Sequence, residues 1–371
     1  MRHLLSDEQV MFADAIDRFV AQEHANVSVT APRAVDRARF ARFAEMGGLS
    51  LAISPDQGGI GGAVETMVVI ERLAPALTPD PVLSSGVHAA ALLAAASASQ
   101  GEALIAGMAA GERIFAIAHL EPGMRRAAPV PETVAQRSGD GFVLNGRKAL
   151  VTSGAEADTL LVSAHIGESG ALAWFVIDGD AAGITRRPAP RIDGMPAADV
   201  DIQDCRVPAS ALLDLDDPVA ALAAADDLAE AAQIAEMVGL MDALVKATTD
   251  YVATRRQFGV AIGTFQALRH RIADMWMECE EARALAYAAA LACSGTAQER
   301  AEAVSIAKVR ACDAADKVGA EAIQIHGGIG MTDELIVSHW YRRLWALKLS
   351  IGDRRWHLAR LADRSRDFAL A

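Results

Sequence analysis

The sequence feature that most constrains the fold is a long stretch that nothing interrupts. Residues 219–254 contain no proline and a single glycine, Gly239. Because proline and glycine are the residues that most often break a helix, this stretch predicts one long helix. We expect two more long helices, over residues 266–293 and 297–325. From residue 216 onward, the chain is therefore expected to be helical.

The segment before residue 216 has a different hydrophobic pattern. Short apolar or alternating runs recur at residues 115–119, 142–144, 159–163 and 173–177. Turn sequences separate them at residues 138–141, 145–146 and 178–180. Several short strands at roughly even spacing are typical of a small antiparallel sheet, which we expect to close near Val207 and Pro208.

The N-terminal part again predicts helices. Ser6 precedes Asp7 and Glu8, which is the pattern of a helix start. Further helix is expected over residues 63–74 and 82–110, with a break around 97–101. The fold class is therefore α+β and mostly α, in the uncommon order helical, β, helical. The expected domains are residues 1–113, 114–215 and 216–371.

Composition limits the function. The formal net charge of −13 argues against a general nucleic-acid-binding protein, which needs a basic surface. The chain has 52% hydrophobic residues, but no stretch is long and apolar enough to predict a membrane span. The four cysteines lie far apart, and the N-terminus lacks the apolar region of a signal peptide. We expect no metal site and a reducing cytoplasmic location.

Several familiar motifs are absent. The chain has no phosphate-binding loop of the GxxxxGK[ST] type, no HExxH and no GxSxG sequence. Neither of its glycine clusters fits the GxGxxG pattern. A nicotinamide-binding site is therefore not expected.

Three other segments carry more information. Residues 255–259 place arginines at the end of the long helix, where they either suit the helix dipole or bind a phosphate. Residues 324–330 place glycines after a helix, either as a cap or for close approach to a ligand. Residues 148–154 place hydroxyl groups at a strand-to-turn junction, where they either stabilise the turn or hydrogen-bond a planar ring.

In this order, and with a glycine-rich loop at residues 55–62, the segments resemble the acyl-CoA dehydrogenase family over nearly the whole chain. The loop is similar to the family's P-E-x-G-G-x-G segment, and residues 145–152 resemble its flavin-facing strand. Residues 255–266 are similar to its R-x-x-F-G…Q segment, and residues 324–330 to its Q-x-x-G-G-x-G segment. Each motif is weak alone, and the resemblance rests on all four in register.

The resemblance implies FAD between the β-domain and a C-terminal four-helix bundle, with a neighbouring subunit completing the site. The positions that match the family's cofactor-binding residues are Thr152, Ser153, Arg255, Phe258, Gln266, Gln324 and Gly328. Thr152 is expected to face the flavin, and Arg255, Phe258 and Gln266 are expected to hold its pyrophosphate and adenine side. Gln324 and Gly328 are expected to reach the FAD of a partner subunit.

The resemblance also implies the reaction and its partners. A base removes the α proton of an acyl-CoA thioester while a hydride passes to the flavin. The implied redox partner is electron-transfer flavoprotein. The implied assembly is a homotetramer, or a heterotetramer with a catalytic acyl-CoA dehydrogenase subunit.

The family's usual catalytic carboxylate is missing. Counting on from Gln324, its position falls at Ile351, and the hydroxyl residue expected two positions later is Asp353. In some relatives the base lies on the long helix, at the position of Ala229. Glu230 is adjacent to it, and Glu236 lies two turns further on the same face. The candidate bases are therefore Glu236, Glu230 and Asp353.

A second departure follows the first expected strand. The family usually has T-E-P-x-x-G-S-D there, whereas this chain keeps Glu121 and Pro122 and continues Gly-Met-Arg-Arg, with His119 in front. The serine contact is lost. Arg125 and Arg126 are expected either to meet a CoA phosphate or to face solvent.

Three functions are consistent with these residues. The first is an active FAD-dependent acyl-CoA dehydrogenase with a displaced base. The second is a catalytically silent subunit that completes the FAD site of another chain. The third is a flavoprotein oxidase or a cofactor-free binding module on the same scaffold.

Overall fold

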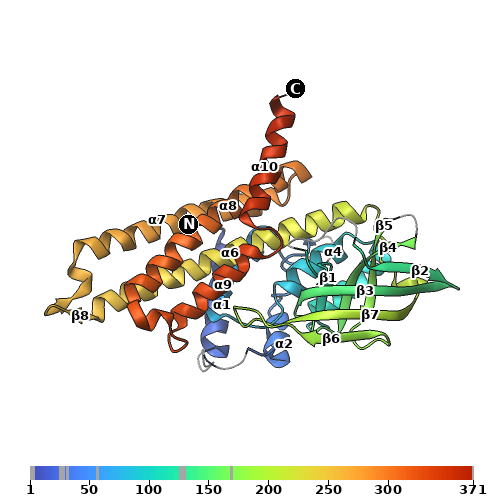
Figure 1. Ribbon diagram of the computed structural model, residues 1–371, viewed down its shortest axis with the longest axis horizontal. Coiled ribbons are helices and arrows are strands. Elements are labelled where there is room, and N and C mark those ends of the chain that lie inside the picture. Colours follow the sequence, from blue (N-terminus) through green and yellow to red (C-terminus); the bar gives the residue numbers. More distant parts are fainter. Residues whose placement is uncertain are drawn as a thin grey trace. The chain divides into compact units, whose positions relative to one another are not determined.

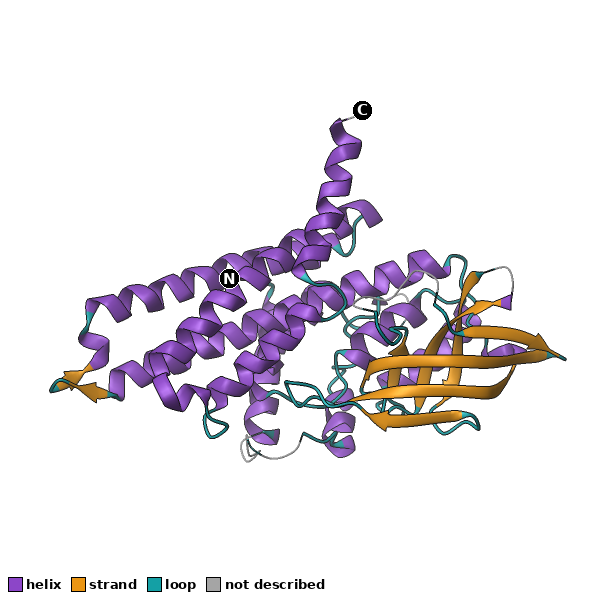
Figure 2. Cartoon of the chain, viewed as in Figure 1, coloured by secondary structure: helices purple, strands orange, loops and turns teal. Residues whose placement is uncertain are grey.

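The computed structural model describes residues 5–24, 30, 33–55, 58–124, 131–167 and 170–369, with residues 364–369 described by their backbone. Helices form both ends of the chain and strands form its middle (Figures 1 and 2). The predicted order helical, β, helical and the mostly helical α+β class are confirmed. Within the described ranges, no helix combines the length and apolar character that a bilayer crossing requires.

The chain packs as two compact units. The first consists of Met1–Pro32, Ala63–Thr78 and Glu230–Ala371, and the second of Arg33–Gly62 and Pro79–Ala229. We call them the helical unit and the sheet unit. The domain boundaries expected at residues 113/114 and 215/216 stay predictions.

The helical unit is built from long helices and a short β-hairpin. Its main elements are α1 (Asp7–Glu23), α3 (Ala63–Leu73), α6 (Pro218–Thr254, from Glu230 on), β8 (Arg256–Gln257), β9 (Val260–Ala261), α7 (Gln266–Ala292), α8 (Ala297–His326), α9 (Ile336–Leu349) and α10 (Arg354–Ala369). The short 3-10 helices η3 (Ala74–Ala76), η7 (Ile262–Thr264) and η8 (Gly327–Met331) connect them. The three long helices predicted from the sequence are confirmed as α6, α7 and α8.

Local chemistry explains how these helices begin, end and approach one another. Ser6 and Thr296 cap α1 and α8 with reciprocal hydrogen bonds to the residue three positions later. Helix α8 ends at Gly327, whose φ of 67° favours glycine. A Cβ at Gly239 would overlap the carbonyl oxygen of Glu71, so this glycine lets α6 and α3 pack closely.

The described part of the sheet unit contains a seven-stranded sheet. Its strands are β1 (Phe115–Ala118), β2 (Val134–Ser138), β3 (Gly141–Thr152), β4 (Thr159–Ile166), β5 (Ala171–Asp178), β6 (Ile184–Pro188) and β7 (Ala197–Pro208). The order is β1-β4-β2-β3-β7-β6, and β5 pairs with β4. Most pairings are antiparallel, as expected, but β4 pairs in parallel with β1 and β2. The long connection from β1 to β4 permits parallel pairing.

The turn predicted at Asn145 and Gly146 is wrong, because both residues lie inside β3 at an irregularity in its pairing with β7. The side chain of Asn145 accepts a hydrogen bond from the backbone N–H of Asp204 (2.8 Å). A Cβ at residue 146 would overlap the side chain of Thr133. The two residues therefore form a β-bulge rather than a chain reversal.

The sheet unit also contains five short helices of the described structure. They are α2 (Arg37–Glu45), the π-helix η4 (Ser84–Ala89), α4 (Ala90–Ala94), α5 (Ala98–Ala109) and the 3-10 helix η6 (Ala209–Ala211). The helix break predicted around residues 97–101 lies instead at residues 95–97, and residues 98–101 belong to α5. Leu92, Leu93, Phe115, Leu161 and Trp174 share one buried apolar cluster, which joins α4 to the sheet.

Candidate functional site

The turn after β3 leaves one hydroxyl group exposed. Thr152 ends the strand and is exposed, and its hydroxyl oxygen accepts a hydrogen bond from Arg191 (3.3 Å). Ser153 is buried, and its hydroxyl lies 3.0 Å from that of Ser84 on η4. Its backbone N–H donates to the carbonyl of Pro196 (3.0 Å). Ser153 therefore fixes the turn, while Thr152 keeps its O–H available for a ligand.

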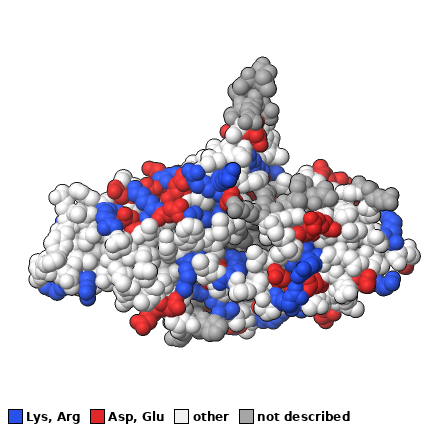
Figure 3. Space-filling model, in the orientation of Figure 1, with Lys and Arg blue, Asp and Glu red and all other residues white. Residues whose placement is uncertain are grey.

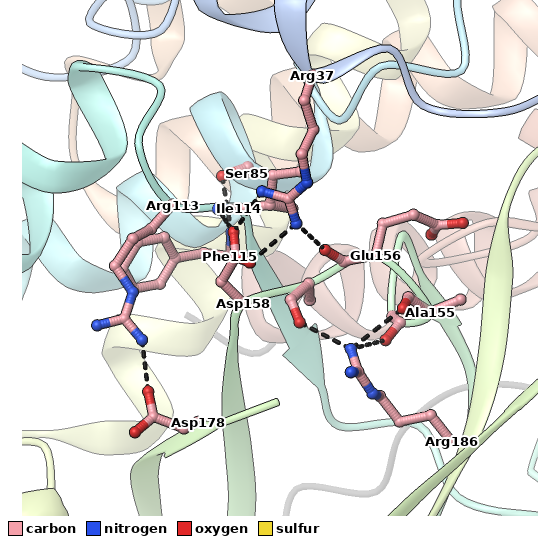
Figure 4. A network of polar contacts seen from close by, with 12 residues as sticks. Arg37, Ser85, Arg113, Ile114, Phe115, Ala155, Glu156, Asp158, Asp178 and Arg186 are labelled. Atoms are coloured by element: carbon pink, nitrogen blue, oxygen red, sulfur yellow. Dashed lines mark hydrogen bonds and ion pairs between the residues drawn. The ribbon is translucent and has the colours of Figure 1, made fainter. Parts of the chain in front are cut away.

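Two arginines hold the backbone that follows (Figure 4). Arg186 donates to three carbonyls of residues 154–157, at 2.7 to 3.3 Å. Arg37 donates both terminal nitrogens to the carboxylate of Asp158, at 2.8 and 2.9 Å. The same carboxylate accepts from the backbone N–H of Ile114 (2.8 Å), so the turn is tied to the start of β1.

A buried polar network lies within the sheet unit. The Glu121 carboxylate accepts hydrogen bonds from the backbone N–H groups of residues 132 and 133 (2.6 and 2.9 Å) and from Lys148 Nζ (2.7 Å). Lys148 also donates to the Ser163 hydroxyl (3.0 Å), whose oxygen lies 2.7 Å from His119 Nδ1. The network thus links the segment after β1 to β3 and β4.

Burial and pairing set the charges of this network. Burial acts to raise the pKa of Glu121, but hydrogen bonds from Lys148, Thr133 and the backbone outweigh it and lower the pKa to about 2. Burial lowers the pKa of Lys148 to about 8 and that of His119 to about 4. At neutral pH the network therefore contains a carboxylate, an ammonium group and a neutral imidazole.

The hairpin end of the helical unit exposes a cation, aromatic rings and an amide. Arg255 is exposed where α6 ends, and Phe258, in the β8–β9 turn, is 91% exposed with a φ of 54°. Its ring meets that of Phe265 edge to face, at 6.2 Å between centroids. Gln266 opens α7 and is also exposed. On the face shown in Figure 3, this end of the bundle is mostly uncharged, with a few Lys or Arg side chains along its lower edge.

An open groove lies beside the hairpin in the helical unit. Its volume is about 590 Å³, and its lining is mostly apolar, with Val245 and Val252 from α6 and Ile272 and Trp276 from α7. Trp276 is 55% exposed. The groove is therefore an apolar surface of the bundle that is separate from the cation of Arg255.

The end of α8 places two further predicted cofactor residues on the surface. Gln324 and Gly328 are exposed, and a Cβ at Gly328 would meet no atom of the described structure. His326 between them is buried, with Nδ1 2.8 Å from the carbonyl oxygen of Ala322 and its ring against Tyr251. His326 is therefore a structural histidine, whereas Gln324 and Gly328 are accessible to a ligand.

Glu236, the first candidate base, has both carboxylate oxygens engaged. Arg343 on α9 donates Nε to one oxygen (2.6 Å) and Nη2 to the other (2.8 Å). Both side chains are largely buried. This two-pronged geometry is typical of a structural ion pair.

Glu230, the second candidate, is almost completely hidden. Its side chain is 1% exposed and pairs with Lys308 Nζ. Lys308 also donates to the carbonyl of Leu347 (2.8 Å), and His357 Nε2 lies 3.6 Å from the other Glu230 oxygen. The carboxylate therefore anchors α8 and the end of α9 to α6.

Asp353, the third candidate, caps a helix. Its Oδ1 accepts a hydrogen bond from the backbone N–H of Trp356 (2.8 Å) in the first turn of α10. Ile351, at the usual base position, has a φ of 58°, which is rare for a β-branched residue. All three candidate carboxylates thus have a structural partner, and their role as bases stays a prediction.

The sequence analysis missed one acid–histidine pair. His88 on η4 places Nε2 2.9 Å from Asp226 Oδ1 on α6, within the sheet unit. The sequence did contain an indication of Asp226, because this residue lies three positions before Ala229 and therefore on the same helix face. The candidate bases predicted on this helix, Glu230 and Glu236, both follow Ala229.

Some predicted features lie outside the described residues. These are Arg125 and Arg126 and, in the glycine-rich loop, Asp56. In the part of the chain that the structure does describe, no three His, Cys, Asp or Glu side chains gather in a way that suits a metal ion.

The exposed residues fit parts of an FAD molecule. An arginine beside aromatic rings and an amide suits a pyrophosphate and an adenine, and the hairpin end of the helical unit provides them. An O–H group that can donate from a rigid turn suits a flavin edge, and Thr152 provides it in the sheet unit. The open space at Gly328 admits close approach of a ligand.

Family models match almost the whole chain. The N-terminal domain of acyl-CoA dehydrogenases matches residues 6–112, the middle domain residues 115–205, and the C-terminal domain residues 228–365. The probable acyl-CoA dehydrogenase YngJ of Bacillus subtilis is 28% identical over 95% of this chain and 96% of its own.

Solved structures agree with the family models. A steroid ACAD variant named Tcur3481-Tcur3483 has 25% identity and a TM-score of 0.86, over 98% of this chain and 99% of its own. The glutaryl-CoA dehydrogenase of Mycobacterium smegmatis in complex with FADH2 has a TM-score of 0.89 over 98% and 96%. Its 21% identity supports the likeness in fold alone.

Proposed function

This chain belongs to the acyl-CoA dehydrogenase family, whose members are FAD-dependent oxidoreductases acting on CH–CH bonds, and we propose that it dehydrogenates an acyl-CoA thioester between its α and β carbons. The observation that carries this proposal is the turn after β3. Ser153, Arg186 and Arg37 hold it rigidly, and only the Thr152 hydroxyl is presented. A fixed donor at an exposed turn is what a flavin ring requires for orientation.

The chain's own residues would hold FAD in the following way. Arg255 offers a guanidinium group to the pyrophosphate, and Phe258 with Gln266 offers a ring and an amide to the adenine side. Thr152 would face the flavin, and Gln324 and Gly328 would approach the FAD of a second subunit. When bound, the flavin supplies the acceptor for the hydride that leaves the β carbon.

The partners follow from the family. Electron-transfer flavoprotein is the redox partner that we propose, and the assembly is a tetramer, homomeric or mixed. The apolar groove between α6 and α7 supports association, because an isolated chain would leave Trp276 largely in water.

A second function is favoured by a specific observation. Glu236, Glu230 and Asp353 each have a structural partner, and Ile351 cannot accept a proton. These facts support a catalytically silent subunit that completes the FAD site of another acyl-CoA dehydrogenase chain. The likeness to a steroid ACAD that bears two chain names is consistent with this alternative.

The visible spectrum of the chain purified alone tests both functions. A flavin absorbance band at about 450 nm that bleaches on anaerobic addition of an acyl-CoA supports a dehydrogenase that is active without a second chain. A colourless chain, or a yellow one that bleaches only after co-expression with a second acyl-CoA dehydrogenase chain, supports the silent subunit. Substrate-dependent oxygen consumption without an added electron acceptor would instead indicate an oxidase.

A further inference from the structure

We propose that His88 is the proton acceptor of this chain and that Asp226 is its positioning residue. The inference rests on the proposed dehydrogenation and supplies the base that the family's usual positions lack. The C–H bond at the α carbon breaks and its proton passes to His88 Nδ1. The electron pair left behind forms the double bond as the hydride leaves the β carbon for oxidised flavin.

The geometry of the pair is that of an oriented base. His88 Nε2 lies 2.9 Å from Asp226 Oδ1, so a proton on Nε2 is held by the carboxylate. This tautomer leaves the lone pair on Nδ1, and the described residues make no hydrogen bond to that atom. A carboxylate that fixes one ring nitrogen and frees the other is the arrangement used by acid–histidine bases in general.

Accessibility separates this pair from Glu230. The side chains of His88 and Asp226 are 18% and 15% exposed, whereas that of Glu230 is 1% exposed. The pair is thus largely shielded from bulk water without being fully buried. A base needs both properties, because it must reach its substrate and must not be neutralised by solvent.

The pair is connected to the turn assigned to the flavin. Ser84 and His88 lie on the same π-helix, η4, and the Ser84 hydroxyl contacts that of Ser153, the residue after Thr152. π-Helical turns are rare and occur frequently at functional sites. The contact fixes where η4, and therefore His88, lies relative to Thr152 within the sheet unit.

The position of Asp226 on α6 also supports His88 as the base. Asp226 and Ala229 are three residues apart on α6, so they share a helix face, about 4.5 Å apart along the axis. Ala229 is the position where some relatives are expected to carry the base. A carboxylate one turn earlier, extended by an imidazole, compensates for the missing side chain at Ala229.

The neighbouring histidine is unsuited to the same role. His119 is buried, with Nδ1 bonded to Ser163 and its ring 5.3 Å from that of Trp174. His119 lies close enough for the charges of Asp226 and His88 to act on its pKa, although burial is the main cause of its lowering. Of the two rings, His88 is the one that a carboxylate holds at one nitrogen, whereas His119 bonds only the Ser163 hydroxyl.

Proton exchange isolates the base from the redox step. Phenylacetyl-CoA has acidic α hydrogens and no β hydrogen, so the purified full-length chain can exchange its protons in D2O without oxidising it. We expect exchange catalysed by the wild-type chain and lowered roughly 10²- to 10⁴-fold in His88→Gln. His165→Gln is the matched control, because His165 lies in the same unit with Nδ1 2.8 Å from the carbonyl oxygen of Pro131.

Two Asp226 variants test the positioning role. Asp226→Asn keeps the size of the side chain and removes its charge, so we expect slower exchange with an unchanged dissociation constant for phenylacetyl-CoA. Asp226→Glu restores part of the rate. A purely structural role for the pair would change the melting temperature of these variants and leave the exchange rate of the folded protein unaltered.

The outcomes separate this inference from the proposed function. Absence of exchange by the wild-type chain, or unchanged exchange in folded His88→Gln and Asp226→Asn, overturns the assignment of His88. Exchange that depends on His88, in a chain whose flavin never bleaches with any acyl-CoA, supports the base and rejects dehydrogenation by this chain alone.

Discussion

Two buried lysines carry the strongest electrostatic constraints at the scale of single residues. Lys148 in the sheet unit and Lys308 in the helical unit have fully buried side chains, and each pairs with a buried glutamate. Taking such charges out of water is costly, and removing one partner leaves the other uncompensated. Both lysines are therefore expected to stabilise the fold, whether or not they lie near the catalytic site.

Lys308→Met is expected to destabilise the chain by about 3–5 kcal/mol, because it leaves the Glu230 carboxylate buried and unpaired. The double variant Lys308→Met with Glu230→Leu is expected to recover most of that loss. Urea unfolding followed by circular dichroism measures both. Lys317→Met is the control: Lys317 pairs with Glu278 at the surface, so its loss is expected to cost less than about 1 kcal/mol.

His119 is expected to make the sheet unit sensitive to mild acid. Its folded pKa is about 4, below the usual 6.5, so between these values the unfolded chain binds a proton that the folded chain does not. Stability therefore falls as pH falls from 6.5 to 4, by about 3 kcal/mol from this group. Glu121, with a pKa of about 2, adds its own loss only below about pH 4.5.

His119→Asn removes the titrating ring and keeps a group that can bond Ser163. Urea midpoints measured at pH 7 and pH 4.5 are expected to differ less in this variant than in the wild-type chain. An equal pH dependence in the two proteins would show that His119 is not the responsible group.

At the scale of helices and strands, close packing is decided by small residues at specific crossings. Gly239 lies where α6 passes α3, and the obstacle to a side chain there is the backbone carbonyl of Glu71, which cannot rotate away. Gly107, in the interior of α5, has no atom near its missing Cβ. Replacing glycine by alanine is therefore expected to destabilise the chain at Gly239 and to stabilise it at Gly107.

Gly239→Ala is expected to destabilise the helical unit by about 1–3 kcal/mol, as overpacking does. Gly107→Ala is expected to stabilise the chain by up to about 1 kcal/mol, because alanine favours a helix interior more than glycine does. Thermal unfolding of the two variants and the wild-type chain measures both signs. A stabilised Gly239→Ala variant would mean that α3 and α6 do not approach as closely as described.

At the scale of the whole molecule, cofactor retention is expected to depend on an exposed ring. Phe258→Ser is expected to lower the ratio of flavin to protein absorbance after purification, with little effect on the melting temperature of the apoprotein, because the ring is 91% exposed. Met11→Ser is the control, since Met11 is 71% exposed on α1, a helix that carries none of the predicted cofactor residues. An equal loss of flavin in both variants would argue against a role for Phe258.

The sequence by itself determined the class of fold, the family and the long helices. Their information is local: the absence of proline over residues 219–254 and the capping residues Ser6 and Thr296 act on their immediate neighbours. The strands that carry apolar runs followed from the same kind of pattern. These were β1, β3, β4 and β5. Strands β2, β6 and β7 were found only in the structure, and β6, which is exposed and charged, has no apolar run.

Only the tertiary structure decided the partners of the titratable groups. Glu236 pairs with Arg343, which is 107 residues away in the sequence, and Glu230 pairs with Lys308, which is 78 residues away. His88 pairs with Asp226, which is 138 residues away. No periodicity or spacing records such pairings, because they depend on which helix faces another after the chain has folded. The family follows from local residue patterns, whereas the environment of each acid and base follows from contacts between distant segments.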